Sequence, residues 1–308
     1  MTFGIELEFF LLDAAGEPAM NSTMEVIRLW RLRRLPNSPV PELGSFQIEL
    51  NPGPWPLSPE GIERALAELR RDVTHLNECA SDLGYSVCAD PLTPRISARH
   101  LAHPCLLAPD ARSRATSSYF SRSQATVRFA NGDTFVFPGE TVLACLNEIH
   151  IHVQGADDRS TIQLFNEFNL HGPALVRDYQ TPIRVNGELL DRACTTMRLF
   201  EEADGEPNLT GTLRRVGCLP DPVHSYAAYQ HAVETFRPIP CAGLDPPFLN
   251  LESSVWFWTR LRGCPGSLRA EFRPMDMGPD WERRVRFLAG RARLLLDTGR
   301  FEYSQLSA

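Results

Sequence analysis

Residues 4–13 read Gly4-Ile5-Glu6-Leu7-Glu8-Phe9-Phe10-Leu11-Leu12-Asp13, and they place two glutamates one residue apart in an otherwise apolar stretch. Successive side chains of a β-strand point to opposite faces. Glu6 and Glu8 therefore share one face, and the other face carries Ile5, Leu7, Phe9 and Leu11. Because Phe10 and Leu12 continue the acidic face as hydrophobic residues, we expect both faces of this strand to be buried.

Two neighbouring carboxylates in a buried place repel each other and lose their hydration. A bound cation removes both penalties, and hard divalent ions such as Mg²⁺ prefer carboxylate oxygens. The first strand therefore predicts a metal site.

Three further stretches alternate in the same way, each with a polar face opposite an apolar one. These polar faces carry Gln47, Glu49 and Asn51; Glu148, His150, His152 and Gln154; and Arg269, Glu271 and Arg273. Pooled, the carboxylates and an imidazole can hold two or more Mg²⁺ or Mn²⁺ ions, and arginines suit phosphate oxygens. This combination on one face of a sheet is what phosphoryl transfer from ATP requires.

Taken alone, each stretch has a simpler interpretation. Glu49 alone is an exposed strand carboxylate, the two histidines are partly buried hydrogen-bonding groups, and the Arg269–Arg273 pattern is a cross-strand ion-pair patch. The repetition of the pattern is what favours the metal interpretation. Arg184, in an expected loop over residues 181–186, is a candidate contact for a phosphate or carboxylate, or else a surface arginine.

These motifs resemble the type 2 glutamate–cysteine ligase (carboxylate–amine ligase) family and, more distantly, glutamine synthetase. The resemblance rests on the opening Glu-x-Glu strand at Glu6, the acidic strand at Glu49, the tract 89–94, the His-x-His-Val strand at His150 and the closing Glu-x-Arg strand at Glu271. The motifs occur in family order and span positions 4 to 273, nearly the whole chain.

The resemblance implies an α+β fold, with a curved, mainly antiparallel sheet, helices on its outer face and a catalytic domain like that of glutamine synthetase. It implies ATP-dependent amide formation from small-molecule carboxylate and amine substrates. The implied metal ligands are Glu6, Glu8, Glu49, His150 and Glu271. Arg273 is implied to contact the transferred phosphate, and His152 to lie near nucleotide or substrate. Glu49 and Arg273 are thus the candidate catalytic residues, and His152, Arg184 and Arg273 the candidate nucleotide contacts.

The chain departs from the family pattern in two places. Relatives usually carry glycine just before or after the His-x-His pair, whereas Asn147-Glu148 precede it here. Residues 125–137 alternate on both sides of Asn131-Gly132, which predicts a β-hairpin that the resemblance does not include. Loops beside a sheet set specificity, so the resemblance does not name the two substrates.

Composition narrows the classes of protein further. With 308 residues and a net charge of −7, the chain is long enough for a large core and is not expected to bind nucleic acid through a basic surface. Its eight cysteines form no Cys-x-x-Cys pair, which argues against a thiolate zinc site.

Because no apolar run reaches the length of a membrane span and Met1-Thr2-Phe3 leads directly into the first strand, we expect no leader, no membrane contact and a cytoplasmic location. We also expect a single ligase-like domain over residues 1–308 and a possible homodimer.

Helices are expected between the strands. Ser58-Pro59 begins an amphipathic helix that ends at Gly84, and another begins at Pro279 or Asp280 and ends at Gly299. Further helices are expected near residues 159–170, 188–202 and 223–236.

The leading hypothesis is an ATP-dependent carboxylate–amine ligase that works through an acyl phosphate. Three alternatives stay open: a phosphotransferase on the same sheet that forms no amide, a non-catalytic relative that binds nucleotide or a partner, and a metal-dependent hydrolase.

Overall fold

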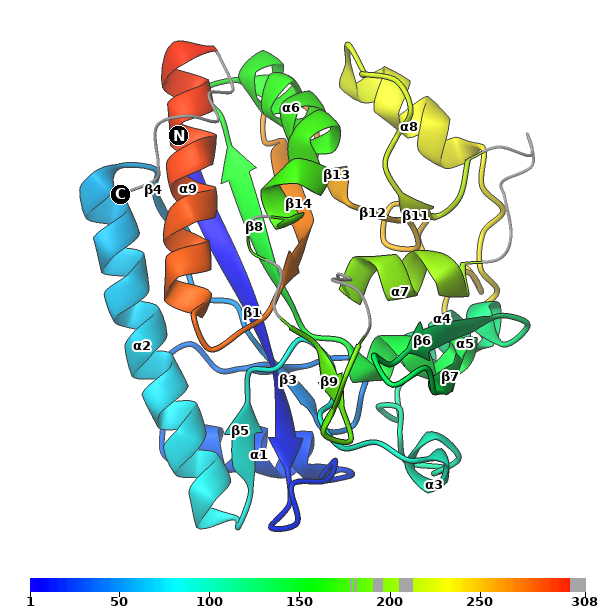
Figure 1. The fold of residues 1–308 in the computed structure, drawn as a ribbon. Helices are drawn as coiled ribbons and strands as arrows, with labels where there is room; N and C mark the ends of the chain where they lie inside the picture. The colour runs from blue at the N-terminus through cyan, green and yellow to red at the C-terminus, as the bar shows by residue number, and fades with distance from the viewer. Residues whose placement is uncertain (178, 180–181, 191–195, 205–212, 300–308) are drawn as a thin grey trace.

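An eight-stranded sheet organises the computed structural model, which describes residues 1–177, 179, 182–190, 196–204 and 213–299 (Figure 1). Its strands are β1 (Thr2–Leu12), β2 (Val40–Pro41), β3 (Gln47–Leu50), β4 (Trp55–Pro56), β5 (Ser86–Cys88), β8 (Glu148–Gln154), β13 (Thr259–Arg262) and β14 (Arg269–Asp276). The strand order is β13-β14-β8-β1-β3-β2, and β4 and β5 also pair with β1. Every pairing in this sheet is antiparallel.

The described helices are α1 (Ser22–Leu32), α2 (Pro59–Asp82), α3 (Ala98–Leu101), α4 (Ala111–Phe120), α5 (Gly139–Val142), the 3₁₀ turn η1 (Leu143–Cys145), α6 (Asp158–Arg177), α7 (Thr196–Ala203), α8 (Tyr226–Glu234) and α9 (Trp281–Thr298). Three small two-stranded sheets join β6 (Gln124–Arg128) to β7 (Thr134–Pro138), β9 (Arg184–Val185) to β10 (Glu188–Leu189), and β11 (Val216–Gly217) to β12 (Trp256–Phe257).

The apolar face of the sheet forms the main core. Phe3, Ile5, Leu7, Phe9 and Leu11 of β1 are buried in one cluster with the apolar stripes of the long helices. Helices α2, α9 and α6 lie side by side over the sheet (Figure 1). The predicted antiparallel sheet in a mixed α and β fold is confirmed, while the curvature of the sheet stays a prediction.

The two helices predicted from their end signals are confirmed. The Ser58 side chain accepts a hydrogen bond from the Gly61 amide at 3.1 Å, and Pro59 is the first residue of α2. Gly84 and Gly299, at φ of 80° and 65°, follow the ends of α2 and α9 in the left-handed conformation that glycine favours.

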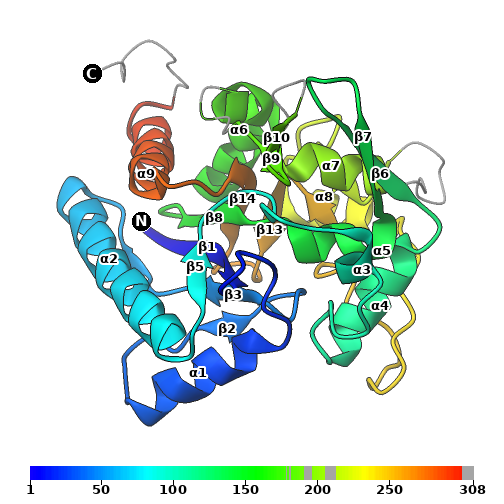
Figure 2. The ribbon, with the colours of Figure 1, turned by 60° about the horizontal axis from the view of Figure 1, so that its bottom comes forward.

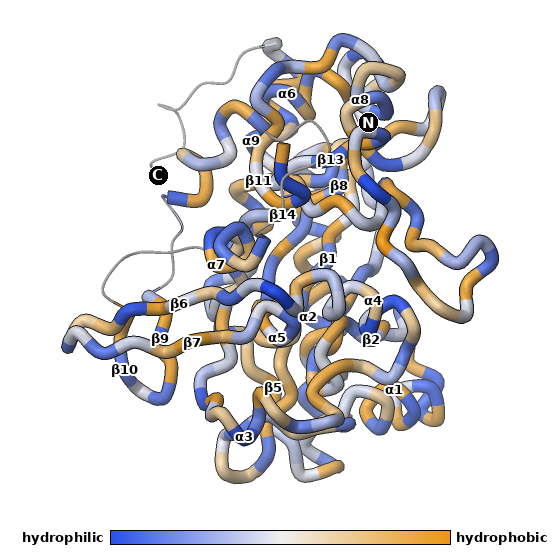
Figure 3. The backbone as a smooth tube through the Cα atoms, turned by 90° about the vertical axis from the view of Figure 1, so that its right-hand side faces the viewer, coloured by the Kyte–Doolittle hydropathy of each residue, from blue (hydrophilic) through white to orange (hydrophobic). Residues whose placement is uncertain are grey.

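A second group of elements lies away from α2 and α9. The predicted hairpin is confirmed as β6 and β7, which pair across Asn131-Gly132. Figure 2 shows this hairpin grouped with α4, α5 and α7 on the side of the molecule opposite α2 and α9, and Figure 3 shows β6, β7, β9 and β10 projecting together. Residues of α4, η1 and α7 line the cavity described below.

Two local predictions were wrong. The helix expected over 188–202 begins at Thr196, because residues 188–189 belong to strand β10; positions 191–195 lie outside the described residues. The loop expected over 181–186 contains strand β9, and position 181 is likewise not described. Asn186 and Gly187, at φ of 55° and 86°, form the tight turn of a β9–β10 hairpin, a signal that the loop assignment overlooked.

Within the described residues, no helix combines the length and the apolar character needed to cross a membrane.

Candidate active site

The polar face of the sheet is built around β1, whose two neighbours bring ionisable groups opposite its glutamates. Glu6 of β1 lies opposite His150 of β8, and Glu8 of β1 lies opposite Glu49 of β3. His152 and Glu271 face each other across β8 and β14. Because all of these strands keep the same alternation, the four acidic or histidine stretches predicted from the sequence converge on one face.

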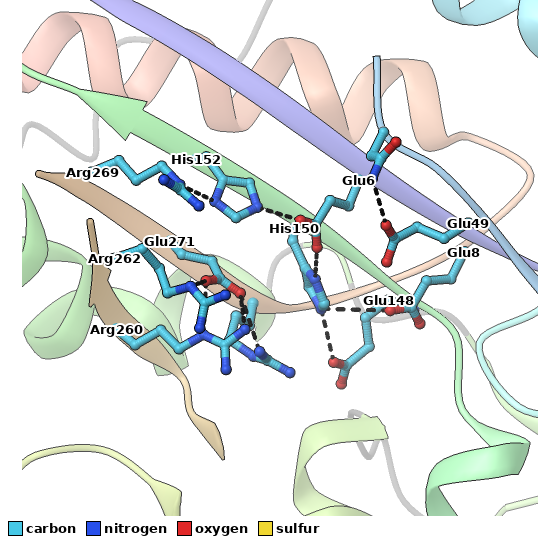
Figure 4. Close-up of polar contacts among 12 residues, drawn as sticks. Glu6, Glu8, Glu49, Glu148, His150, His152, Arg260, Arg262, Arg269 and Glu271 are labelled. Carbon is cyan, nitrogen blue, oxygen red and sulfur yellow. Dashed lines mark hydrogen bonds and ion pairs between the residues drawn. The ribbon is translucent and has the colours of Figure 1, made fainter. Parts of the chain in front are cut away.

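Glu6 lies between the two histidines (Figure 4). Its carboxylate oxygens are 2.7 Å from Nδ1 of His150 and 2.7 Å from Nε2 of His152. Burial alone would raise the pKa of Glu6, but the hydrogen bonds to His150 and His152 outweigh it and hold that pKa well below its ordinary value. Burial and Arg273 lower the pKa of His150, yet its contacts with Glu148 and Glu6 raise it above the ordinary range overall. Glu6 and the buried His150 therefore form a partly buried ion pair.

Three carboxylates form an acid cluster, which we define as Glu8, Glu42 and Glu49. One oxygen from each lies within 4.8 Å of the others. Burial, with smaller contributions from Glu42 and Glu148, raises the pKa of Glu8 to about 8. Burial and then the charges of Glu6, Glu42 and Glu8 raise the pKa of Glu49 well above its ordinary value. This crowding of hard oxygen donors fits a divalent ion such as Mg²⁺, which would relieve the repulsion.

A second set of donor atoms comes from Glu6, His152 and Glu271, again within 4.8 Å of one another. Glu271 is fully buried, and Nε and Nη2 of Arg260 donate to its two oxygens at 2.7 Å each. Nη1 of Arg273 adds a hydrogen bond at 3.1 Å. Burial alone would raise the pKa of Glu271, but the charge of Arg260 dominates and holds that pKa well below its usual range. This set fits a metal less well than the acid cluster, because arginines already satisfy its buried carboxylate.

Two cavities open on this face and share Glu6. The first, about 200 Å³, is lined by the acid cluster, Glu148, His150 and three arginines of β13 and β14 (Arg260, Arg262 and Arg273). Arg112 of α4, Leu143 of η1, Phe200 of α7 and Trp256 of β12 also line it. The second cavity is larger, about 530 Å³, and continues along the start of β1 past Gly4, His152, Gln154 and Arg269. Nε of Arg269 donates to Nδ1 of His152 at 3.3 Å, so a guanidinium lies beside Glu6 and His152 in this second cavity.

The structure brings together all but one of the site residues predicted from sequence: Glu6, Glu8, Glu49, His150, His152, Glu271 and Arg273. It does not bring Arg184 to them. Arg184 is exposed on β9, donates to the carbonyl of Gly187 at 3.0 Å and lines neither cavity, so the geometry lends no support to its predicted nucleotide contact. His152 lies with Glu6 and Glu271 in a set of donor atoms, and His150 lies between Glu6 and Glu148. The metal role expected for His150 and the nucleotide contact expected for His152 stay predictions.

Several site residues were missed by the sequence reasoning. Glu42 lies just beyond β2, outside any alternating pattern, and no local signal identified it. Arg260 and Arg262 alternate with Thr259 and Leu261 immediately before the closing strand, and this two-residue period could have revealed them.

Comparisons with known proteins give a family match and a shared fold. The family model described as glutamate-cysteine ligase family 2 matches residues 2–176. A solved structure of a bifunctional glutathione synthetase from Pasteurella multocida is 15% identical, with a TM-score of 0.56; the match covers 98% of this chain and 40% of that one, so this chain spans well under half of that protein's length. A structure of glutamate–cysteine ligase from Francisella tularensis in complex with AMP is 11% identical, with a TM-score of 0.46, over 97% of this chain and 71% of that one. A search of curated protein sequences found no match. The Pasteurella similarity shows a shared fold.

Proposed function

The chain belongs to glutamate-cysteine ligase family 2, and we propose that it is an ATP-dependent carboxylate–amine ligase. An oxygen of the acid's carboxylate would attack the γ-phosphorus of ATP, which gives an acyl phosphate and releases ADP. The amine nitrogen would then attack the acyl carbon, and the C–O bond to phosphate would break. The products are an amide, inorganic phosphate and the proton lost by the amine.

The observation that carries this proposal is the acid cluster beside a set of arginines in one cavity, of which Arg260 and Arg273 are buried. Glu8, Glu42 and Glu49 are the residues that would hold a divalent ion. When bound, such an ion supplies positive charge to phosphate oxygens and acts as a Lewis acid. Arg273 and Arg262 line the same cavity and can donate to the equatorial oxygens of a transferred phosphoryl group.

The larger cavity supports a position for the nucleotide. It is about 530 Å³, is lined by Arg269, His152 and Gln154, and adjoins the smaller cavity at Glu6. A nucleoside in the larger cavity would direct its phosphates toward the acid cluster. The acid and the amine would then meet in the smaller cavity, where Phe200 and Trp256 in the wall would help to exclude water from the reactive intermediate.

The first test measures ATP binding by calorimetry with Mg²⁺ and with EDTA, followed by ADP release in a screen of acids against amines. We expect binding to require Mg²⁺, and ADP release to require both an acid and an amine. Glu49→Gln should lower turnover by about 100-fold or more, because it removes a direct ligand. Glu188→Gln, at an exposed position on β10, is the matched control and should behave like the wild type.

Other outcomes would point to other functions. A stable phosphorylated acid that accumulates without any amine would identify a phosphotransferase. Tight Mg²⁺-dependent ATP binding without ADP release for any pair would favour a non-catalytic nucleotide-binding protein.

A further inference from the structure

The Glu271 carboxylate has arginine partners, whereas the carboxylates of the acid cluster have none in the part of the chain that the structure describes. Arg260 spans both of its oxygens at 2.7 Å, and Arg260 is itself only 8% exposed. Nη1 of Arg273 contacts one of these oxygens at 3.1 Å, and Nε of Arg262 lies 3.6 Å from the other. Among the described residues, no arginine forms an ion pair with any member of the acid cluster.

This difference sets how readily each donor set takes a cation. A divalent ion at the acid cluster would meet three carboxylates that lack a cationic arginine partner. An ion at Glu6, His152 and Glu271 would share the Glu271 carboxylate with Arg260 and lie beside its positive charge. Like charges in a buried place repel strongly, so the arginine and the ion compete for Glu271.

Arg260 has an alternative partner within reach. It lines the smaller cavity, and its Nη1 donates to the backbone carbonyl of Val255 at 3.2 Å, which anchors the side chain independently of Glu271. The planar fork that chelates a carboxylate matches phosphate oxygens equally well. A phosphate entering the cavity can therefore draw the guanidinium from Glu271.

We propose that Arg260 substitutes for a divalent ion at Glu271 in the nucleotide-free protein, and that nucleotide phosphates release Glu271 by taking over Arg260. The nucleotide-free protein then binds one divalent ion tightly, at the acid cluster, and the second donor set fills only when nucleotide is present. The inference rests on the proposed ATP chemistry, and it adds an order of assembly. The buried carboxylate is never left without a cation, because an unpaired buried charge is strongly destabilising.

The test counts Mn²⁺ ions bound to the metal-stripped full chain, using the electron paramagnetic resonance signal of free Mn²⁺. We expect one tight ion in the wild type and two in R260Q. The second ion should bind R260Q about tenfold or more tightly than it binds the wild type, since a charge-assisted hydrogen bond is worth about that factor. R262Q is the matched control: it lies two residues along the same strand at 3.6 Å from Glu271, and should still bind one ion.

Two further arms keep the test decisive if R260Q folds poorly. R260K keeps the charge but lacks the fork, so its affinity for the second ion should lie between those of the wild type and R260Q. Adding the non-hydrolysable ATP analogue AMP-PNP to the wild type should raise the count from one to two. Four results would each overturn the proposal. In the nucleotide-free wild type these are two tightly bound ions or no bound ion. The others are a single bound ion in folded R260Q and an ion count that stays at one when AMP-PNP is added to the wild type.

The count needs no turnover, so the two proposals can fail separately. The wild type could bind one ion without nucleotide and two with AMP-PNP, yet release no ADP with any acid and amine. That result would contradict the ligase assignment and support the arginine exchange. Two ions in the nucleotide-free wild type together with normal ADP release would do the reverse.

Discussion

At the residue scale, Glu8 shows how the fold places an unfavourable charge where an ion can bind. Its side chain is almost fully buried, and burial raises its pKa from 4.5 to about 8, so the metal-free protein holds it mostly protonated at neutral pH. The backbone amide of Glu148 donates to its Oε2 at 2.9 Å and fixes the carboxyl in the cavity. A bound divalent ion would require the carboxylate form, so binding should displace a proton.

The raised pKa of Glu8 predicts a pH-dependent stability. Between about pH 4.5 and 8 the folded state binds this proton and the unfolded state does not, so the free energy of unfolding of the metal-free protein should fall as pH rises through that window. Urea titrations at several pH values in EDTA would measure the slope. Glu8→Gln should flatten it, and saturating Mg²⁺ should restore stability at pH 8. An unfolding free energy that is independent of pH in this range would contradict the raised pKa.

Glu271 and Glu49 should respond in opposite ways to loss of their charge. Glu271→Gln leaves buried Arg260 and Arg273 without their carboxylate, and breaking a buried ion pair of this kind costs about 3–5 kcal/mol. Glu49→Gln removes repulsion within the acid cluster and should leave the metal-free protein as stable as the wild type or more so. Urea midpoints of the two variants in EDTA would compare them directly. Equal destabilisation by both changes would show that the two carboxylates do not differ in this way.

At the element scale, the start of α2 depends on a close approach to β4. A Cβ added at Gly61 would lie 2.0 Å from the carbonyl oxygen of Pro56, a backbone atom that cannot move aside. Gly290, inside α9, has no heavy atom within 4 Å of the same position. Gly61→Ala should therefore destabilise the protein by at least about 2 kcal/mol through overpacking.

Gly290→Ala provides the control, since it should stabilise the protein by about 0.5–1 kcal/mol through helix propensity alone. Thermal unfolding of both variants measures the contrast. A neutral Gly61→Ala would mean that β4 does not hold the start of this helix.

Elements with a strong period or clear end signals could be predicted from the sequence. The long alternating strands β1, β8 and β14 and the capped helices α2 and α9 are of this kind. The two-residue strands β2 and β4 could not, because pairing with a neighbour rather than local preference makes them extended.

The same distinction separates the site residues that could be predicted from the sequence from those that could not. Glu6, His150 and Glu271 lie on long alternating strands, so their common face could be deduced before their partners were known. Glu42 reaches the acid cluster from beyond a two-residue strand, and only the tertiary fold shows that it belongs there. The alternating pattern places Glu271 on the polar face, but it does not predict that Glu271 binds Arg260 in this structure rather than a metal.

At the scale of the whole molecule, the site depends on strands β1 and β14, which are far apart in sequence, lying in one sheet. The sheet order places β14 two strands from β1, with β8 between them, so Glu6 and Glu271 contribute to the same set of donor atoms although they are far apart in sequence. The apolar face and its helices hold this order, while α4, η1 and α7 contribute to the cavity wall on the polar face. Binding of metal and nucleotide should therefore stabilise the fold as a unit.

The measurement that tests the ligase account most directly follows oxygen-18 from the acid substrate into phosphate. The acid that supports ADP release would be labelled in both carboxylate oxygens, and the inorganic phosphate would be analysed by mass spectrometry. An acyl phosphate intermediate predicts that each phosphate released with the amide carries one labelled oxygen, and that Glu49→Gln releases almost none. Phosphate that contains oxygen only from ATP and water would contradict the account, because it would mean that the acid carboxylate never attacks ATP.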